Sequence, residues 1–61
     1  MKHFYFIERN SGEEFIVGAD TLEEAWLIAK WVALDLDEDP DLDGGDEMTD
    51  EEAEMSGWDE Y

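Results

Sequence analysis

Residues 2–36 read KHFYFIERNSGEEFIVGADTLEEAWLIAKWVALDL, and here the apolar residues change from a period of two to a helical period. From Lys2 to Arg9, aromatic and β-branched residues alternate between two faces, which favours a strand. Asn10-Ser11-Gly12 supplies turn residues, and the alternation resumes from Glu14 to Ala19. This stretch predicts a two-stranded antiparallel hairpin.

A helix is predicted to begin directly after this hairpin. Thr21 and Glu24 form a capping box, in which the Thr21 hydroxyl accepts from the Glu24 amide and the Glu24 carboxylate reaches back to Thr21. The helical pattern continues to about Leu36, where Pro40 and a run of acidic residues oppose its extension. The predicted fold class is therefore α+β, with a hairpin packed on one helix (ββα) over residues 1–36.

Apolar residues of this helix occupy two separate stripes. At about 100° per residue, one stripe collects Leu22, Ala25, Trp26, Ala29, Ala33 and Leu36, and the nearly opposite stripe collects Leu27, Trp31 and Leu34. A surface helix needs only one apolar stripe, and a two-stranded sheet covers only one. We expect the second stripe to face the C-terminal tail, a second copy of the chain, or a binding target.

Residues 37–61 are predicted to form an acidic C-terminal arm. Residues 37–47 form a low-complexity acidic linker, and Thr49 with Glu52 opens a second capping box, which predicts a short helix near 49–56. A purely disordered tail seldom carries two methionines, a tryptophan and a tyrosine. We therefore expect part of the arm to dock, with Trp58 or Met55 on the second helical stripe.

The charge is concentrated in this arm. The formal net charge is -17, and residues 35–61 hold fourteen acidic residues and no basic one, against six acidic and three basic residues in 1–34. Nucleic acid and anionic membranes are poor partners for such a chain, because phosphate is repelled. A basic nucleic-acid-binding protein is a good partner. The start of the chain does not resemble a signal peptide and no apolar run spans a bilayer, so we expect a cytoplasmic location.

Catalysis is not expected from this composition. The only histidine, His3, lies at the start of a strand with no nucleophile to pair with it, and a short chain has little with which to wall a carboxylate pair. The absence of cysteine excludes disulfides and thiolate zinc sites. The sequence predicts a binding protein without cofactor.

One motif points to calcium as an alternative. Asp39, Asp41, Asp43 and Gly44 match the D-x-D-x-D-G opening of an EF-hand loop between two predicted helices. The twelfth loop position is Asp50, whose side chain is shorter than the usual glutamate, and the exiting helix is barely two turns long. A chance match in an Asp-rich run and a solubilising tail remain the simpler readings of these residues.

Dense carboxylates with interleaved aromatic residues point to mimicry of nucleic acid. Duplex DNA carries one charge per ~1.7 Å, and proteins read it largely through Lys and Arg. Acidic residues would imitate the phosphates, and exposed tryptophans would anchor the contact. The predicted partner-binding residues are Asp35, Asp37, Glu38, Asp39, Asp41, Asp43, Asp46, Glu47, Asp50, Glu51, Glu52, Glu54, Trp31 and Trp58.

In size, isoelectric point and charge layout the chain resembles small acidic inhibitors made by phages and mobile elements, such as anti-CRISPR proteins and inhibitors of uracil-DNA glycosylase. Residues 49–61 also look like the ends of small uncharacterised proteins of gut Firmicutes and their phages. The resemblance implies a stoichiometric inhibitor that blocks the basic groove of a CRISPR effector or DNA repair enzyme in a bacterial host. A calcium-binding or structural interaction module of a phage is the alternative, and the second helical stripe leaves a homodimer open.

Overall fold

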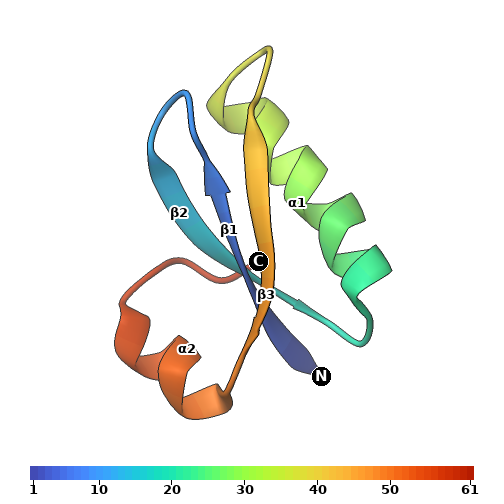
Figure 1. Ribbon diagram of the computed structural model, residues 1–61, viewed down its shortest axis with the longest axis vertical. Helices are drawn as coiled ribbons and strands as arrows, with labels where there is room; N and C mark the ends of the chain where they lie inside the picture. Colours follow the sequence, from blue (N-terminus) through green and yellow to red (C-terminus); the bar gives the residue numbers. More distant parts are fainter.

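The computed structural model describes all 61 residues as one three-stranded antiparallel sheet with two helices. The elements follow in the order β1 (Lys2–Glu8), β2 (Glu13–Ala19), α1 (Leu22–Leu36), β3 (Leu42–Met48) and α2 (Asp50–Ser56). The sheet has the order β2-β1-β3, so β1 is central (Figure 1). The predicted hairpin and both predicted helices are confirmed, and the predicted number of strands is wrong.

The hydrophobic core lies between α1 and one face of the sheet. The face of β1 and β2 that packs on α1 carries Phe4, Phe6, Phe15 and Val17, because every second residue of a strand points to the same side. Ala25, Ala29 and Ala33 are fully buried, and their small side chains let the helix lie close to the strands. Trp26 adds an edge-to-face contact with Phe6, with ring centroids 4.9 Å apart.

The linker predicted over 37–47 is wrong from Leu42 onward, because these residues form β3. Its sequence, LDGGDEM, is poor in strand-forming residues, but β1 offers a free edge and pairs with it from His3–Met48 to Glu8–Leu42. The register shifts between Tyr5 and Phe6, which leaves Gly45 as the extra residue of a β-bulge. Hydrogen bonds from a neighbouring strand, rather than apolar side chains, therefore build this strand.

Glycine is required at the bulge because β1 approaches too closely for a side chain. Gly44 has φ 119°, and a Cβ there would lie 2.5 Å from the carbonyl oxygen of Tyr5. A Cβ at Gly45 would lie 3.1 Å from Nε1 of Trp26. Gly44 thus permits the close approach of the β1 backbone, and Gly45 leaves room for the Trp26 ring.

The C-terminal residues dock on the sheet and not on the second stripe of α1, which corrects the sequence-based expectation. Beside β2, the Tyr61 amide donates to the Ile16 carbonyl at 2.8 Å, and the Ile16 amide donates to the Asp59 carbonyl at 2.9 Å. Trp58 packs against Tyr5, whereas Met55 is 79% exposed. The tail follows the sheet because β1 and β2 have a second face with its own apolar residues to cover.

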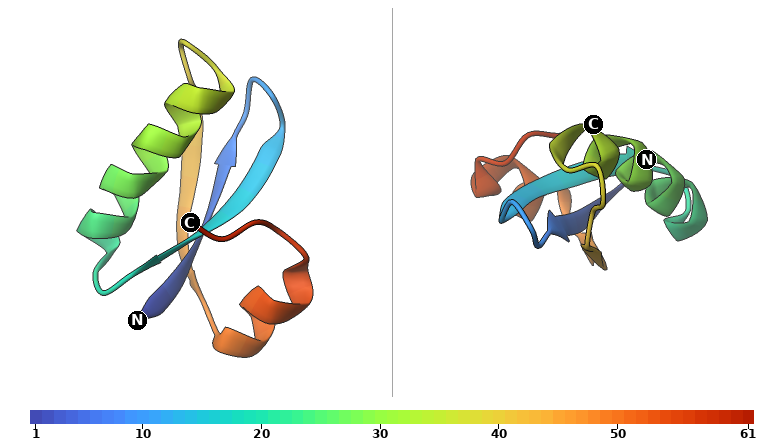
Figure 2. Two further views of the ribbon diagram at one scale, coloured as in Figure 1. Left: turned by 180° about the vertical axis from the view of Figure 1, so that it is seen from behind. Right: turned by 90° about the horizontal axis from the view of Figure 1, so that it is seen from above.

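The two helices lie on different sides of the sheet. α1 runs along the face that carries Phe4 and Phe6, while α2 and Trp58 meet the face that carries His3 and Tyr5 (Figure 2). The last residues run along the outer edge of β2, where the Tyr61 ring packs edge-to-face on Phe15 of the core. Neither helix has the length and apolar composition needed to cross a bilayer.

Candidate functional site

The twelve predicted partner-binding carboxylates lie on three successive parts of the chain, and we call them together the acidic ridge. The ridge follows the α1–β3 connection, the edge strand β3 and helix α2, which succeed one another along the long axis of the molecule (Figure 1). Its members are Asp35, Asp37, Glu38, Asp39, Asp41, Asp43, Asp46, Glu47, Asp50, Glu51, Glu52 and Glu54. All but Asp37 are exposed.

The charge density of the acidic ridge lies in the range of nucleic acid. The Cα trace extends 31 Å along its longest axis. Over that length, one strand of DNA carries roughly 9 phosphates and a duplex roughly 18, at about 3.4 Å per charge on each strand. Twelve carboxylates fall between these two values. A surface that binds phosphates through Lys and Arg therefore meets a similar number of negative charges here.

Few positive charges neutralise the ridge. Arg9 contacts Asp43 at 2.5 Å and Lys2 lies 3.7 Å from Glu47, while His3 contacts Asp50 at 2.7 Å. The remaining nine carboxylates of the ridge form no ion pair. The Gly44 amide, and after it Arg9, hold the pKa of Asp43 below its usual value. The ridge thus keeps most of its charge available to a partner.

The two tryptophans predicted as anchors do not share a surface. Trp31 lies on the outer side of α1 and is 74% exposed. Trp58 is 37% exposed and packs on Tyr5 across the sheet, with ring centroids 5.0 Å apart. Trp58 therefore lies on the same face of the sheet as Tyr5 and α2, whereas Trp31 lies on the far side of α1.

Tyr5 and Glu14 belong to this region but were missed in the sequence. The Tyr5 hydroxyl donates to Glu14 at 3.1 Å. Burial raises the pKa of Tyr5, the hydrogen bond to Glu14 raises it further, and the negative charges of Glu14, Asp46 and Asp43 add to the shift. Tyr5 and Trp58 form an aromatic patch, with Glu14 bonded to Tyr5 and Asp46 opposite Tyr5 on β3. The alternation of β1 already placed Tyr5 on the second face of the strand, which is the signal that could have found it.

Glu8 connects Asp41, the residue before β3, to the hairpin. It is the one buried charged residue, and its carboxylate accepts from the amides of Asp41 at 2.8 Å, Ser11 at 2.7 Å and Asn10 at 3.1 Å. Burial alone would raise the pKa of Glu8, but these backbone hydrogen bonds outweigh it and lower the pKa to about 2. Glu8 was not singled out in the sequence, although it follows Phe4 and Phe6 in the alternation of β1, which is the signal that could have placed it on the core side.

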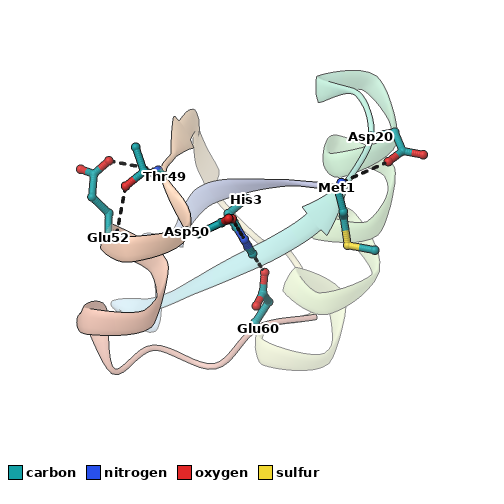
Figure 3. Close-up of polar contacts among 7 residues, drawn as sticks. All are labelled: Met1, His3, Asp20, Thr49, Asp50, Glu52 and Glu60. Carbon is teal, nitrogen blue, oxygen red and sulfur yellow. Dashed lines mark hydrogen bonds and ion pairs between the residues drawn. The ribbon is translucent and has the colours of Figure 1, made fainter.

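His3 holds the C-terminal segment and α2 to β1. Its Nδ1 contacts the Glu60 carboxylate and its Nε2 lies 2.7 Å from Asp50 Oδ1, the first residue of α2 (Figure 3). The Glu60 contact is the main cause of a raised His3 pKa, removal from water opposes it, and Asp50 adds to it. The ring bridges two carboxylates and approaches no nucleophile, so its role is to hold segments together.

The residues of the calcium motif are dispersed. Asp43 lies in β3 and pairs with Arg9, and Asp50 contacts His3 instead of closing a loop. No three His, Cys, Asp or Glu side chains anywhere in the chain are grouped to hold a metal ion. An EF-hand needs its loop ligands to converge on one point, and β3 separates them instead.

Comparison of the chain with protein-family models, curated proteins and solved structures finds no match.

Proposed function

We propose that this protein binds the basic nucleic-acid-binding groove of another protein and blocks it by imitating nucleic acid, without catalysing a reaction. The observation that carries the proposal is the acidic ridge, whose charge density lies between those of single-stranded and duplex DNA. By resemblance to the acidic inhibitors of phages and mobile elements, the proposed targets are CRISPR effectors and DNA repair enzymes of a bacterial cytoplasm.

The way the ridge is held supports the proposal. A mimic gains affinity when its charges are positioned before binding, because less conformational entropy is lost in the complex. The central carboxylates lie on β3, which pairs with β1 along its length, and the capping box of Thr49 and Glu52 fixes the first turn of α2. Glu8 and His3 tie the two ends of this region to β1.

The aromatic patch of Tyr5 and Trp58 supplies a source of specificity. Charge alone gives weak binding to many basic surfaces, whereas buried aromatic side chains often dominate the affinity of a specific interface. Because Glu14 accepts a hydrogen bond from Tyr5 and Asp46 lies opposite Tyr5 on β3, a partner that reaches Trp58 also meets the charges of the ridge.

The test begins with capture of the target from a bacterial lysate and its identification by mass spectrometry. Affinity for the purified target is then measured at two salt concentrations, with and without a DNA or RNA competitor. We expect affinity to fall steeply with salt, and we expect the nucleic acid to compete for the same site. An affinity that changes with neither the salt concentration nor the nucleic-acid competitor would contradict the proposal.

Charge variants distinguish long-range electrostatic attraction from direct contact with the target. Replacing Glu51 and Glu52 by Gln should mainly slow association, because long-range attraction is lost. The matched control is Glu13→Gln, an exposed carboxylate on β2 outside the ridge, which should change association less than either ridge substitution. Equal effects at both places would mean that net charge, and not the ridge, determines binding.

A further inference from the structure

The outer side of α1 carries an apolar surface that the rest of the chain leaves open. Leu27, Trp31 and Leu34 are 62%, 74% and 51% exposed, and we call these three residues the outer face of α1. The sheet lies on the other side of the helix, and α2 lies beyond the sheet (Figures 1 and 2). Single exposed apolar residues are common, but three large ones side by side indicate an interaction site.

The spacing of these residues is that of a helix–helix contact. Leu27, Trp31 and Leu34 occupy positions i, i+4 and i+7, so they lie in one row along the helix. Fifteen residues make α1 about four turns long, which is enough to pack along another helix of similar length. The outer face therefore offers a row of anchors with Trp31 at its centre.

A hollow extends this surface toward β3. Its volume is about 410 Å³, and it is lined by Lys30, Ala33, Leu34, Pro40, Asp41 and Leu42. Leu34 belongs both to the hollow and to the outer face, so the two are continuous. A partner that packs on Trp31 can place one more apolar side chain in the hollow.

The charges around the outer face determine which partner fits. By helical geometry, Glu24 and Asp35 border one side of the row, and Glu23 and Lys30 border the other. Asp41 adds a carboxylate at the hollow, so acidic residues outnumber the one lysine. Two copies of the chain would bring these borders together, with a net charge of -17 on each, and would repel each other. Lys and Arg at the borders of a partner helix would instead be attracted.

We propose that the outer face of α1 binds a basic amphipathic helix of a partner protein. The apolar side of that helix packs on Leu27, Trp31 and Leu34, and its Lys and Arg residues meet Glu23, Glu24 and Asp35. The inference rests on the proposed function only in that both require a basic partner. The outer face and the acidic ridge meet at Asp35, so one target can contact both.

The test uses a model helix, so it does not depend on knowing the target. The probe is a synthetic peptide of Leu, Ala and Lys, about 18 residues long and with a single leucine stripe, which is long enough to form a helix. One control peptide has the same composition in scrambled order, and a second carries Glu in place of every Lys. Titration into ¹⁵N-labelled protein gives both the dissociation constant and the binding surface.

We expect the leucine-striped cationic peptide to shift the amide signals of α1 and to bind more tightly than either control. Trp31→Ala should weaken binding about tenfold or more, as expected for a central anchor, whereas Met55→Ala, an equally exposed apolar residue on α2, should leave it unchanged. Because Trp31 is largely exposed, its truncation spares the core, and Leu27→Ala provides a second variant.

Three results would overturn the inference. The scrambled peptide could bind as tightly as the striped one, the shifts could fall on β3 and α2 alone, or sedimentation equilibrium could show a dimer that Trp31→Ala dissociates. The last result would assign the outer face to a second copy. Mimicry by the ridge is judged separately, by competition between the target and nucleic acid, so either proposal can fail alone.

Discussion

The two neighbours of β1 are opposite in composition, yet both pair with it as antiparallel strands. β2 (EEFIVGA) has four of its seven residues buried, whereas β3 (LDGGDEM) has none. β2 is a strand because its alternating apolar residues pack against α1 in the core. β3 is a strand because β1 presents unpaired amides and carbonyls, and because a glycine bulge lets the acidic chain approach them.

The two outer edges of the sheet are protected in different ways. Residues 59–61 cover the outer edge of β2 through backbone hydrogen bonds with Ile16 and Gly18. No strand pairs with the outer edge of β3, which carries Asp43, Asp46 and Glu47. Charged residues at a free edge oppose pairing with another chain. The composition that makes β3 a poor strand on its own therefore also protects it and supplies the centre of the acidic ridge.

Gly44→Ala should have the largest effect, because a side chain at this position would prevent β3 from approaching β1. Its Cβ would lie 2.5 Å from the Tyr5 carbonyl oxygen, at a φ of 119° that is unfavourable for alanine. We expect a loss of roughly 3 kcal/mol or more in the free energy of unfolding, measured with urea. Gly12→Ala is the matched control: its φ is also positive, but no atom lies within 4 Å, so it should cost only about 1 kcal/mol. Similar losses at both glycines would refute the close-approach explanation.

Glu8→Gln should have the next largest effect, since Glu8 fastens the hairpin to the residue that precedes β3. The native pKa of about 2 lies below the ordinary value of 4.5. The stabilisation from ionised Glu8 is therefore complete above about pH 4.5 and is lost as the pH falls through about 2.

Urea unfolding of both proteins between pH 2 and 7 measures this contribution. The difference in stability between wild type and Glu8→Gln should be largest at neutral pH and shrink toward pH 2. Glu13→Gln, an exposed neighbour in the same hairpin, should show little difference at any pH. A constant difference between wild type and Glu8→Gln would mean that shape, and not ionisation, explains the effect.

The covered edge of β2 should loosen as the pH rises. The pKa of His3 is raised by its contacts with Glu60 and Asp50, so its stabilising charge is fully present below about 6.5 and is lost as the pH rises through the higher native value. We expect hydrogen exchange at the Tyr61 and Gly18 amides, corrected for its intrinsic pH dependence, to accelerate over that interval. In His3→Gln the corrected rates should not change with pH. Wild-type rates that follow the variant would show that His3 does not hold the C-terminal segment.

Salt should have the smallest effect, and should act mainly through the ridge. Screening of repulsion among the carboxylates of β3 and α2 is expected to raise the melting temperature by a few degrees between about 0.02 and 0.2 M NaCl. Asp46→Asn on β3 should raise the melting temperature at low salt, and the gain should shrink at high salt. A melting temperature that does not depend on salt would mean that the ridge charges do not strain the fold.

Much of the fold could be predicted where side chains themselves impose the structure. The alternation of Phe4, Phe6, Phe15 and Val17 and the capping residues Thr21 and Thr49 act within a few residues of their own position, and the structure confirms the elements they predict. The exposure of the acidic residues could be expected from the sequence, since a charged side chain is costly to bury, whereas their binding of a partner stays a prediction. The Tyr5–Trp58 patch was missed, because that contact joins residues 53 positions apart.

By itself the sequence determined the hairpin, the two helices, the concentration of charge in residues 35–61 and the second apolar row of Leu27, Trp31 and Leu34. Tertiary structure alone decided that Leu42–Met48 is a strand with Asp43, Asp46 and Glu47 on the edge of the sheet, that Trp58 packs on Tyr5 and not on α1, and that the row on α1 stays open. The physical reason is that local patterns report only the free energy available within a segment. β3 gains its hydrogen bonds from β1, more than thirty residues away, and nothing in LDGGDEM encodes that edge.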